Sequence, residues 1–263
     1  MADGGAIGPV VAESVPDAIY HLAALSHVGE SWASPSTVLR VNVLGTAEVL
    51  AAARALGTDP VVLVVSSAEV YGSVRPEQLP LGEDAPMAPV SPYAASKAAA
   101  EEVARQAWRG YGQRVVLVRP FNHIGPGQAP TFAVSALARR IVQAARSGTR
   151  TLTVGNLTTR RDFTDVRDVV RAYRLLVEHG RPGQVYNVCS GHDTAIAEIV
   201  GRLMELTGVE LTLEPDPSLV RPVDVPVLRG DHALLQAATG WKPEISLDET
   251  LVDVISYWRA ELD

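Results

Sequence analysis

The sequence predicts an α/β protein with a Rossmann-like, doubly wound parallel sheet and a smaller C-terminal lobe. Residues 61–66 and 114–120 are short, continuous runs of apolar and β-branched residues, which are typical of strands buried on both faces of a parallel sheet. Segments with helical patterns separate these runs along the chain. Strands that alternate with helices favour a parallel sheet with right-handed crossovers.

Length and composition narrow the class of protein. The 263 residues suffice for a sizeable core, and 47% hydrophobic against 20% charged residues is ordinary for a globular chain. The net charge of −7 argues against a general nucleic-acid or anionic-membrane partner, and no apolar run reaches membrane-spanning length. The single cysteine, Cys189, lies in an apolar run and cannot form an internal disulfide, which favours a reducing cytoplasm. No spacing of His, Cys, Asp and Glu indicates a metal site.

The first part of the chain predicts one strand and one long helix. Residues 4–8 are glycine-rich, but no strand precedes them, so we do not interpret them as a phosphate-binding turn. Residues 18–23 have the apolar pattern of a buried strand, and a loop separates them from a helix expected at 35–56. Asn42 lies inside this helix near small residues, which favours close helix packing over ligand contact.

A capped helix follows the strand at 61–66 after a long loop, 67–91. Ser91 is a favourable N-cap residue and Pro92 suits the first helical position, so we expect a helix at 92–109. The remaining predicted elements are, in order, the strand 114–120, a turn-rich loop at 121–128, a helix at 132–147, a strand at 151–154, the polar segment 160–165 with a helix after it to about 178, a strand at 184–188, a helix at 195–207, a strand at 211–213, a proline-rich loop at 214–226, and helices near 231–238 and 247–260, the last with a capping box of Ser246 and Glu249.

These elements divide into two predicted lobes. We expect residues 1–122 with 162–180 to form a Rossmann-like cofactor domain. Residues 123–161 with 181–263 are expected to form the second lobe, over the carboxyl edge of the sheet. Open α/β sheets bind their ligands at that edge, so the cleft between the lobes is the expected site.

Three side chains at this edge have the chemistry of a proton-transfer site. Tyr93 and Lys97 lie at i and i+4 in the first turns of the predicted helix, so the phenol and the ammonium share one face. A neighbouring cation favours the phenolate and lowers the tyrosine pKa from its reference value of about 10. Ser67, at the end of its strand, can hydrogen-bond the same substrate oxygen. Taken alone, the Tyr-x-x-x-Lys pair is a weak signal, because both residues are common on solvated helix faces.

The combination of motifs is more specific. The strand is followed by Ser-Ser-Ala-Glu-x-Tyr-Gly at 66–72, and the helix opens with Ser-Pro-Tyr-Ala-x-Ser-Lys at 91–97. Here the sequence resembles the extended short-chain dehydrogenase/reductases that act on nucleotide sugars. The resemblance implies that Ser67, Tyr93 and Lys97 are the catalytic trio. Further motifs extend it over nearly the whole chain, at 20–28, 31–32, 42–46, 119–128, 161–168, 186–191 and 240–243.

Together these motifs resemble the GDP-4-keto-6-deoxy-D-mannose reductases, which make GDP-D-rhamnose. They also resemble the GDP-mannose 4,6-dehydratases, but Phe-Asn-His at 121–123 is followed here by Ile-Gly-Pro-Gly-Gln, which favours the reductase. The resemblance implies that NADH or NADPH delivers hydride to C4 of a keto-sugar while Tyr93 protonates the oxygen. Glu69 is an expected site residue that separates the two reactions. A dehydratase needs a base and usually a second acid, and the neighbouring Ala68 can donate nothing.

The resemblance also assigns binding residues. Besides Tyr93 and Lys97, the expected cofactor-lining residues are Leu22, Ala23, Ala24, Ser66 and Pro120. The expected substrate-binding residues are Ser26, His27, Asn122, Arg139, Arg161 and Arg221. Arginine suits a diphosphate because its planar fork matches phosphate oxygens and keeps its charge. Exposed surface charge is a strong alternative for Arg139 and a weaker one for the other two arginines. For His27 and His123, a structural role competes with substrate contact.

One departure from the family is large. Its chains begin with a strand, a glycine-rich turn and a helix that bind the cofactor pyrophosphate, and no such segment precedes residues 18–23. We therefore expect 18–23 to be a sheet edge, covered by a segment such as residues 1–16 or by another chain, and we expect weak NAD(P)H binding. Three hypotheses stay open: a reductase, a related dehydratase or epimerase, and a non-catalytic remnant that binds a nucleotide sugar or a partner chain. The choice between NADH and NADPH stays open too. The resemblance implies a homodimer formed by helices 36–56 and 92–109.

Overall fold

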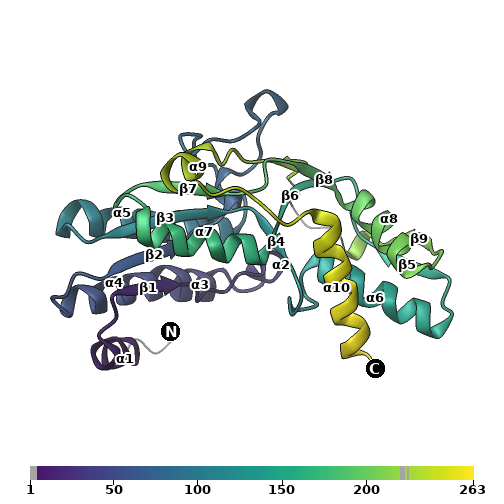
Figure 1. Ribbon diagram of the computed structural model, residues 1–263, viewed down its shortest axis with the longest axis horizontal. Helices are drawn as coiled ribbons and strands as arrows, with labels where there is room; N and C mark the ends of the chain where they lie inside the picture. The colour runs from purple at the N-terminus through teal and green to yellow at the C-terminus, as the bar shows by residue number, and fades with distance from the viewer. Residues whose placement is uncertain (1–4, 220–222, 224) are drawn as a thin grey trace.

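The computed structural model describes residues 5–219, 223 and 225–263. Two parts lie side by side (Figure 1): a parallel sheet between helices, and a second lobe that contains the C-terminus. The helices are α1 (Ile7–Ser14), α2 (Val28–Ser31), α3 (Pro35–Leu39), the π-helical η1 (Arg40–Leu44), α4 (Gly45–Ala55), the 3-10 turns η2 (Ala68–Tyr71), η3 (Pro76–Gln78) and η4 (Pro217–Leu219), α5 (Pro92–Tyr111), α6 (Ala133–Ser147), α7 (Val166–His179), α8 (Ile196–Thr207), α9 (Ala233–Thr239) and α10 (Leu247–Glu261). The strands are β1 (Ala18–His21), β2 (Val61–Val65), β3 (Val115–Pro120), β4 (Asn122–Ile124), β5 (Thr151–Val154), β6 (Arg160–Asp165), β7 (Val185–Val188), β8 (Asp193–Ala195), β9 (Thr212–Pro215) and β10 (Val227–Leu228).

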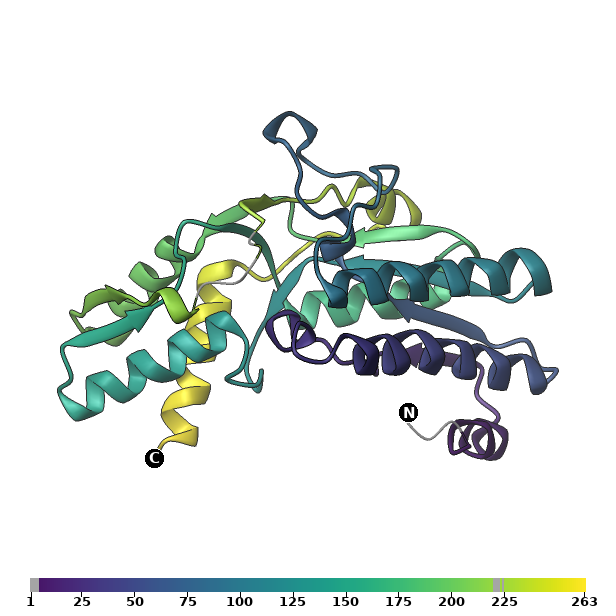
Figure 2. The same ribbon diagram turned by 180° about the vertical axis from the view of Figure 1, so that it is seen from behind.

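The main sheet has parallel strands in the order β1-β2-β3-β7. Successive residues of β2 face opposite helix layers: Val61 and Leu63 pack with α7, whereas Val62 and Val64 pack with α4 and α5. The two layers are seen from opposite sides in Figures 1 and 2, with α7 nearest the viewer in the first and α4 and α5 nearest in the second. The doubly wound parallel sheet predicted from the sequence is confirmed.

Strand β1 is an edge of the main sheet, as predicted, and among the described residues it pairs with β2 alone. The helix α1 was not predicted. Its Ile7 packs against the layer of core residues that contains Ile19 of β1 and Val49 of α4. Residues 7–14 therefore cover part of the β1 edge on the face of the sheet that packs against α4. Tyr20 and Leu22 remain 42% and 60% exposed.

Helix α5 begins where the capping residues predict it. The Ser91 hydroxyl accepts a hydrogen bond from the Ala94 amide at 3.1 Å, and Pro92 is the first helical residue. The last helical residue is Tyr111, two residues beyond the predicted end, and the C-cap residue Gly112 adopts the left-handed conformation with φ of 72°. The small buried Ala104 on its inner face allows close packing against β2 and β3.

The second lobe has its own core, formed mainly by α6, α8 and α10 around residues such as Ile141, Leu203 and Trp258. Its sheet places β6 between β10 and β4, with β8 antiparallel to β6, and β5 pairs separately with β9. Ser246 and Glu249 form the predicted capping box of α10.

Some predicted elements differ from the structure. The helix expected at 35–56 is divided into α3, the π-helical turn η1 and α4. The polar segment 160–165 is the strand β6, because its neighbours β4, β8 and β10 pair its backbone and all its side chains except that of Arg160 are buried. The predicted second-lobe range 181–263 is wrong at β7, since this strand pairs with β3 in the main sheet.

Three buried aspartates of the motif at 161–168 join the lobes. Asp162 accepts hydrogen bonds from the amides of residues 190, 191 and 230, which holds two loops against β6. Asp165 caps α7 and accepts a hydrogen bond from a threonine of α10. Asp168 accepts hydrogen bonds from the amides of residues 244 and 245. The acidic side chains of this motif therefore have structural partners in the chain itself.

Candidate active site

The predicted trio comes together at the carboxyl edge of the main sheet. Ser67 follows β2 and is the N-cap residue of η2, where its hydroxyl accepts a hydrogen bond from the Glu69 amide at 3.2 Å. The first two turns of α5 supply Tyr93 and Lys97. All three trio side chains are at least nine-tenths buried. The strand end and the helix start therefore bring together residues that are separated by a long loop in the sequence.

Tyr93 has a different electrostatic environment from the one that the sequence predicts. Burial raises the pKa of Tyr93 to about 12, a hydrogen bond with the Ser67 side chain opposes this shift, and the Glu69 carboxylate adds to it. The expectation that Lys97 lowers the pKa of this phenol is wrong for the chain alone. Loss of water around the phenol is the largest cause of the shift, because burial disfavours the charged phenolate, and Lys97 is not among the groups that lower this pKa.

Lys97 is fixed by the strand that leads to Ser67. Its Nζ donates a hydrogen bond to the main-chain carbonyl of Val65 at 2.7 Å. Burial lowers the pKa of Lys97 to about 8, in the direction expected for a desolvated ammonium. An ammonium has three N–H donors, and Val65 accepts one of them, so two remain for a ligand.

A second row of polar residues supports the loop after β1. Buried Asn42 accepts a hydrogen bond from the Leu25 amide at 2.8 Å, and its amide nitrogen donates to the Leu25 carbonyl and to Ser96. The His21 ring nitrogen is 3.0 Å from the Thr46 hydroxyl. Asn42 thus links this loop to α5, which is a structural role more specific than the helix packing that the sequence indicates.

The predicted cofactor-lining residues lie at the ends of three neighbouring strands. Leu22 and Ala23 are exposed directly after β1, Ala24 is half-buried, Ser66 is buried after β2, and Pro120 ends β3. Exposed small residues beside a lysine with free donors fit the nicotinamide and ribose part of NAD(P)H. The roles of these residues stay a prediction.

Three predicted substrate residues border the same edge. Ser26 is exposed in the loop before α2, and Asn122 is exposed at the start of β4. Both ring nitrogens of His27 lie within hydrogen-bonding distance of the backbone, at 3.0 Å from the Glu30 amide and 3.0 Å from the Thr131 carbonyl oxygen. These contacts favour the structural role of His27, which connects the loop to the start of the second lobe.

Two of the predicted arginines, Arg139 and Arg161, belong to the second lobe. Arg161 is buried in β6, where its guanidinium donates to the Arg160 carbonyl at 2.8 Å. Arg139 lies on α6 with its guanidinium carbon 5.6 Å from the centre of the Trp258 ring, so part of its surface packs on α10. Arg221 lies outside the described residues. Arg161 is not a surface charge, which removes the simplest alternative to ligand binding for this residue.

Burial lowers the pKa of His123, the other histidine considered as a substrate contact, and its Nδ1 is 3.2 Å from the Phe121 carbonyl oxygen.

Within the described residues, no group of three His, Cys, Asp or Glu side chains could hold a metal ion. No helix of this described part is long and apolar enough to cross a membrane.

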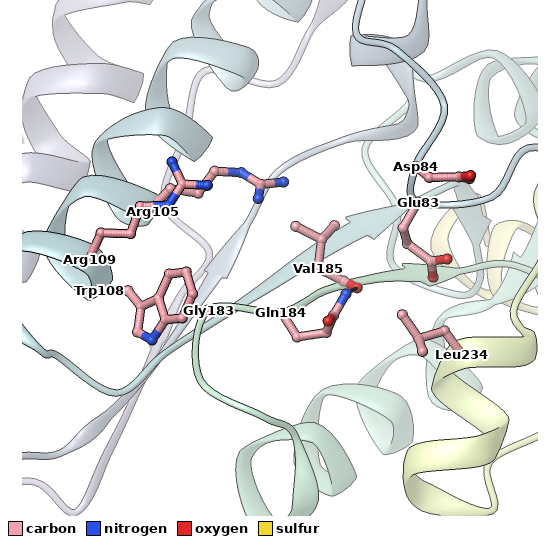
Figure 3. A pocket seen from close by; sticks show the side chains of 9 residues that line it. All are labelled: Glu83, Asp84, Arg105, Trp108, Arg109, Gly183, Gln184, Val185 and Leu234. Atoms are coloured by element: carbon pink, nitrogen blue, oxygen red, sulfur yellow. Dashed lines mark hydrogen bonds between the residues drawn. The ribbon is translucent and has the colours of Figure 1, made fainter.

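A hollow of about 510 Å³ lies elsewhere, along the outer edge of β7 (Figure 3). Figure 3 places Val185 between the side chains of Arg105 and Trp108 on α5 and that of Glu83 in the loop before α5. Trp108 is about 22 Å further along α5 than Tyr93, at 1.5 Å per helical residue. This hollow is therefore remote from the trio and is not the candidate active site.

The fold and the trio define an extended short-chain dehydrogenase/reductase. The sequence model described as GDP-mannose 4,6 dehydratase matches residues 1–254, and the chain belongs to this family. Among curated relatives, the GDP-6-deoxy-D-mannose reductase of Pseudomonas aeruginosa is 41% identical over 249 residues, which are 94% of this chain and 82% of the relative. A GDP-mannose 4,6-dehydratase of Vibrio cholerae is 27% identical over 97% of this chain and 76% of its own.

Solved structures agree with this classification. RMD from Pseudomonas aeruginosa, complexed with NADPH, superposes with a TM-score of 0.93 at 39% identity over 99% of this chain and 86% of that chain. A UDP-glucose 4-epimerase from Thermotoga maritima with UDP-glucose has a TM-score of 0.92 at 26% identity, over 100% of this chain and 83% of that chain. The dTDP-glucose 4,6-dehydratase DesIV from Streptomyces venezuelae, with NAD and TYD bound, has a TM-score of 0.84 at 30% identity, over 98% and 77%.

Proposed function

We propose that this chain reduces the C4 ketone of a GDP-linked 4-keto-6-deoxy sugar with NADPH or NADH. The observation that carries the proposal is the buried Tyr93, which is hydrogen-bonded to Ser67 and has its pKa raised to about 12. At neutral pH this phenol holds its proton, and a ketone reduction needs a proton donor. The relative with 41% identity is a GDP-6-deoxy-D-mannose reductase, which supports the same direction of reaction.

The residues act together on the carbonyl oxygen. The Ser67 hydroxyl donates a hydrogen bond to this oxygen, and Tyr93 transfers its proton there as negative charge develops. Lys97, held by the Val65 carbonyl, binds the ribose with its remaining donors and stabilises the phenolate that the transfer leaves. NAD(P)H, when bound, supplies the hydride. Arg161 and Arg139 of the second lobe would hold the diphosphate, together with Arg221, whose role rests on the family resemblance alone.

A related dehydratase is the second candidate, because the family description and several relatives carry that name. Dehydration requires removal of the C5 proton and loss of the C6 hydroxyl. Glu69 lies close enough to raise the pKa of Tyr93 and is the candidate base. Ala68 beside it supplies no acid, which is why we favour reduction. Non-catalytic binding of a nucleotide sugar is the third candidate.

The test is a set of three incubations of the purified chain. GDP-4-keto-6-deoxy-D-mannose with NADPH or NADH should give a product two mass units heavier, and a C4-deuterated cofactor should place deuterium at C4 of the sugar. GDP-mannose with NAD or NADP should stay unchanged. Conversion of GDP-mannose to a keto-sugar without net reduction of the NAD or NADP would instead identify a dehydratase. Calorimetric binding of GDP without either reaction would identify the non-catalytic alternative.

We also propose a homodimer in a reducing compartment. Leu39 and Leu44 are 42% and 56% exposed on the segment formed by α3 and η1, which packs beside α5. Two such faces would cover these leucines in a helix bundle. Sedimentation should give a dimer for the parent chain and a monomer for a variant with Leu39→Glu and Leu44→Glu. The buried, unpaired Cys189 suits the reducing cytoplasm predicted from the sequence.

A further inference from the structure

Helix α5 presents a stripe of polar side chains to the carboxyl ends of two strands. Tyr93, Lys97 and Glu101 follow one another at intervals of four residues, so they lie on one face. Lys97 attaches this face to β2 through the Val65 carbonyl. Glu101 attaches it to β3, through Arg119. The helix that carries the trio is therefore held at two points on neighbouring strands.

The second attachment is a completely buried ion pair. The Arg119 Nη2 donates to Glu101 Oε1 at 2.6 Å, and the Nε donates to Oε2 at 3.0 Å, so the guanidinium fork matches the carboxylate. Arg119 is 2% exposed and Glu101 is 0% exposed. Burial opposes ionisation of Glu101, but the hydrogen bonds and charge of Arg119 outweigh it and keep the pKa of Glu101 below its ordinary value.

Arg119 also holds the turn that carries Ser67. Its Nη1 donates to the Tyr71 hydroxyl at 3.0 Å and to the Glu83 carbonyl at 3.0 Å. Tyr71 is the last residue of η2, the turn that begins after Ser67, and it donates in turn to Asn187 of β7 at 2.7 Å. One guanidinium therefore joins the turn after β2 to helix α5.

We propose that Arg119 is a positioning residue, which sets the separation between Ser67 and Tyr93 through Tyr71 on one side and Glu101 on the other. It does not contact the reacting atoms. Its effect is geometric: both hydroxyls must reach one substrate oxygen, and a displacement of about 1 Å can lower the rate a hundredfold. The activity part of this inference rests on the proposed reductase function.

A purely structural role is the alternative. A buried ion pair can be replaced by apolar residues with little loss of stability, whereas removal of one partner leaves an uncompensated charge. Loss of activity in one single variant would therefore not distinguish positioning from misfolding. Two variants separate the roles. Tyr71→Phe removes the link to the Ser67 turn and leaves the ion pair intact, and the double variant Glu101→Leu with Arg119→Met removes the pair without leaving a charge.

The experiment compares Arg119→Lys, Tyr71→Phe and the double variant with Arg105→Met. Arg105 also donates to Glu101, at 2.8 Å, but it belongs to α5 itself, and its charged partners among the described residues, Glu101 and Glu102, lie in the same helix. Two measurements are made on each purified chain. The first is hydrogen exchange of the peptide that contains residues 67–72, and the second is kcat and KM for the 4-keto nucleotide sugar. Thermal unfolding accompanies both.

We expect exchange in 67–72 to accelerate about tenfold or more in the three test variants and to remain parental in Arg105→Met. We expect kcat to fall by about tenfold to a hundredfold, with KM for the sugar within about twofold. The double variant should regain thermal stability without regaining kcat. Parental exchange in Tyr71→Phe and Arg119→Lys, or parental kcat in the stable double variant, would overturn the proposal. If the parent chain does not turn over the 4-keto nucleotide sugar but the three test variants still exchange faster than the parent in residues 67–72, the positioning inference is retained and the reductase function is refuted.

Discussion

The Nζ of Lys97 donates a hydrogen bond to the main-chain carbonyl oxygen of Val65 at 2.7 Å. This bond joins the second turn of α5 to the last residue of β2. Because Ser67 lies two residues beyond Val65 and Tyr93 lies one helical turn before Lys97, the contact ties together the backbone elements that carry the trio. Lys97 therefore has a structural partner in the chain as well as its predicted chemical role.

Lys97→Met should separate these two roles. The variant loses one charge-assisted hydrogen bond but also a buried ammonium, so we expect the free energy of unfolding to change by only about 1 kcal/mol. The reductase rate should fall about a hundredfold or more, because the phenolate left on Tyr93 loses its cation. Denaturant unfolding and steady-state kinetics measure the two effects. A variant with parental kcat would exclude Lys97 from the reaction.

Tyr93→Phe keeps the buried ring and removes the proton donor. We expect kcat to fall by about 10² to 10⁴, the range for loss of a general acid, with little change in stability. Tyr111→Phe is the matched control, since Tyr111 is 56% exposed at the far end of α5. Near-parental turnover of the keto-sugar by Tyr93→Phe would show that the proton comes from another group.

Glu69→Gln tests the choice between reduction and dehydration. The Glu69 carboxylate helps to raise the pKa of Tyr93, so its neutralisation should lower that pKa. We expect the pH at which reduction declines to move downward, and kcat at neutral pH to change less than about tenfold. Reactions in deuterated water supply the second readout. Deuterium at C5 of the sugar, abolished in Glu69→Gln, would favour the dehydratase.

Arg161→Gln tests the diphosphate site. A lost charge-assisted contact should weaken GDP binding by roughly 1–3 kcal/mol in calorimetric titration. The neighbouring Arg160→Gln is the control: Arg160 points to the opposite face of β6 and pairs with Asp193 and Glu198. If both variants bind GDP like the parent while both remain folded, Arg161 serves only the packing of the second lobe.

His21 should make stability depend on pH. Burial and the neighbouring Lys97 lower the pKa of His21 to about 4, whereas an unfolded histidine titrates near 6.5. The unfolded chain therefore binds the proton first as pH falls, so stability present above about 6.5 is lost progressively toward 4. The loss amounts to roughly 3 kcal/mol. Chemical unfolding at several pH values should show a flatter dependence for His21→Gln than for the parent, with His179→Gln as an exposed control. Equal slopes in His21→Gln and the parent would contradict this assignment.

The sequence by itself determined the elements whose signals are local. Ser91 and Pro92 predicted the start of α5, and alternation of strands with helices predicted the doubly wound sheet. The meeting of Ser67, Tyr93 and Lys97 at one edge of the sheet was also predictable, because their motifs lie at a strand end and a helix start. Strand β6 was missed because its residues are polar, and the partners that pair and bury it come from distant parts of the chain.

Tertiary structure alone decided the electrostatics of the site and its supports. The i, i+4 spacing predicted that Lys97 lowers the pKa of Tyr93, but the direction depends on how much water each group loses, and burial wins. The sequence patterns assigned no particular role to Arg119 or Glu101. Their pairing depends on the packing of α5 against β3, which sequence spacing does not encode. Long-range burial thus set the protonation state of Tyr93 and the contacts that position it.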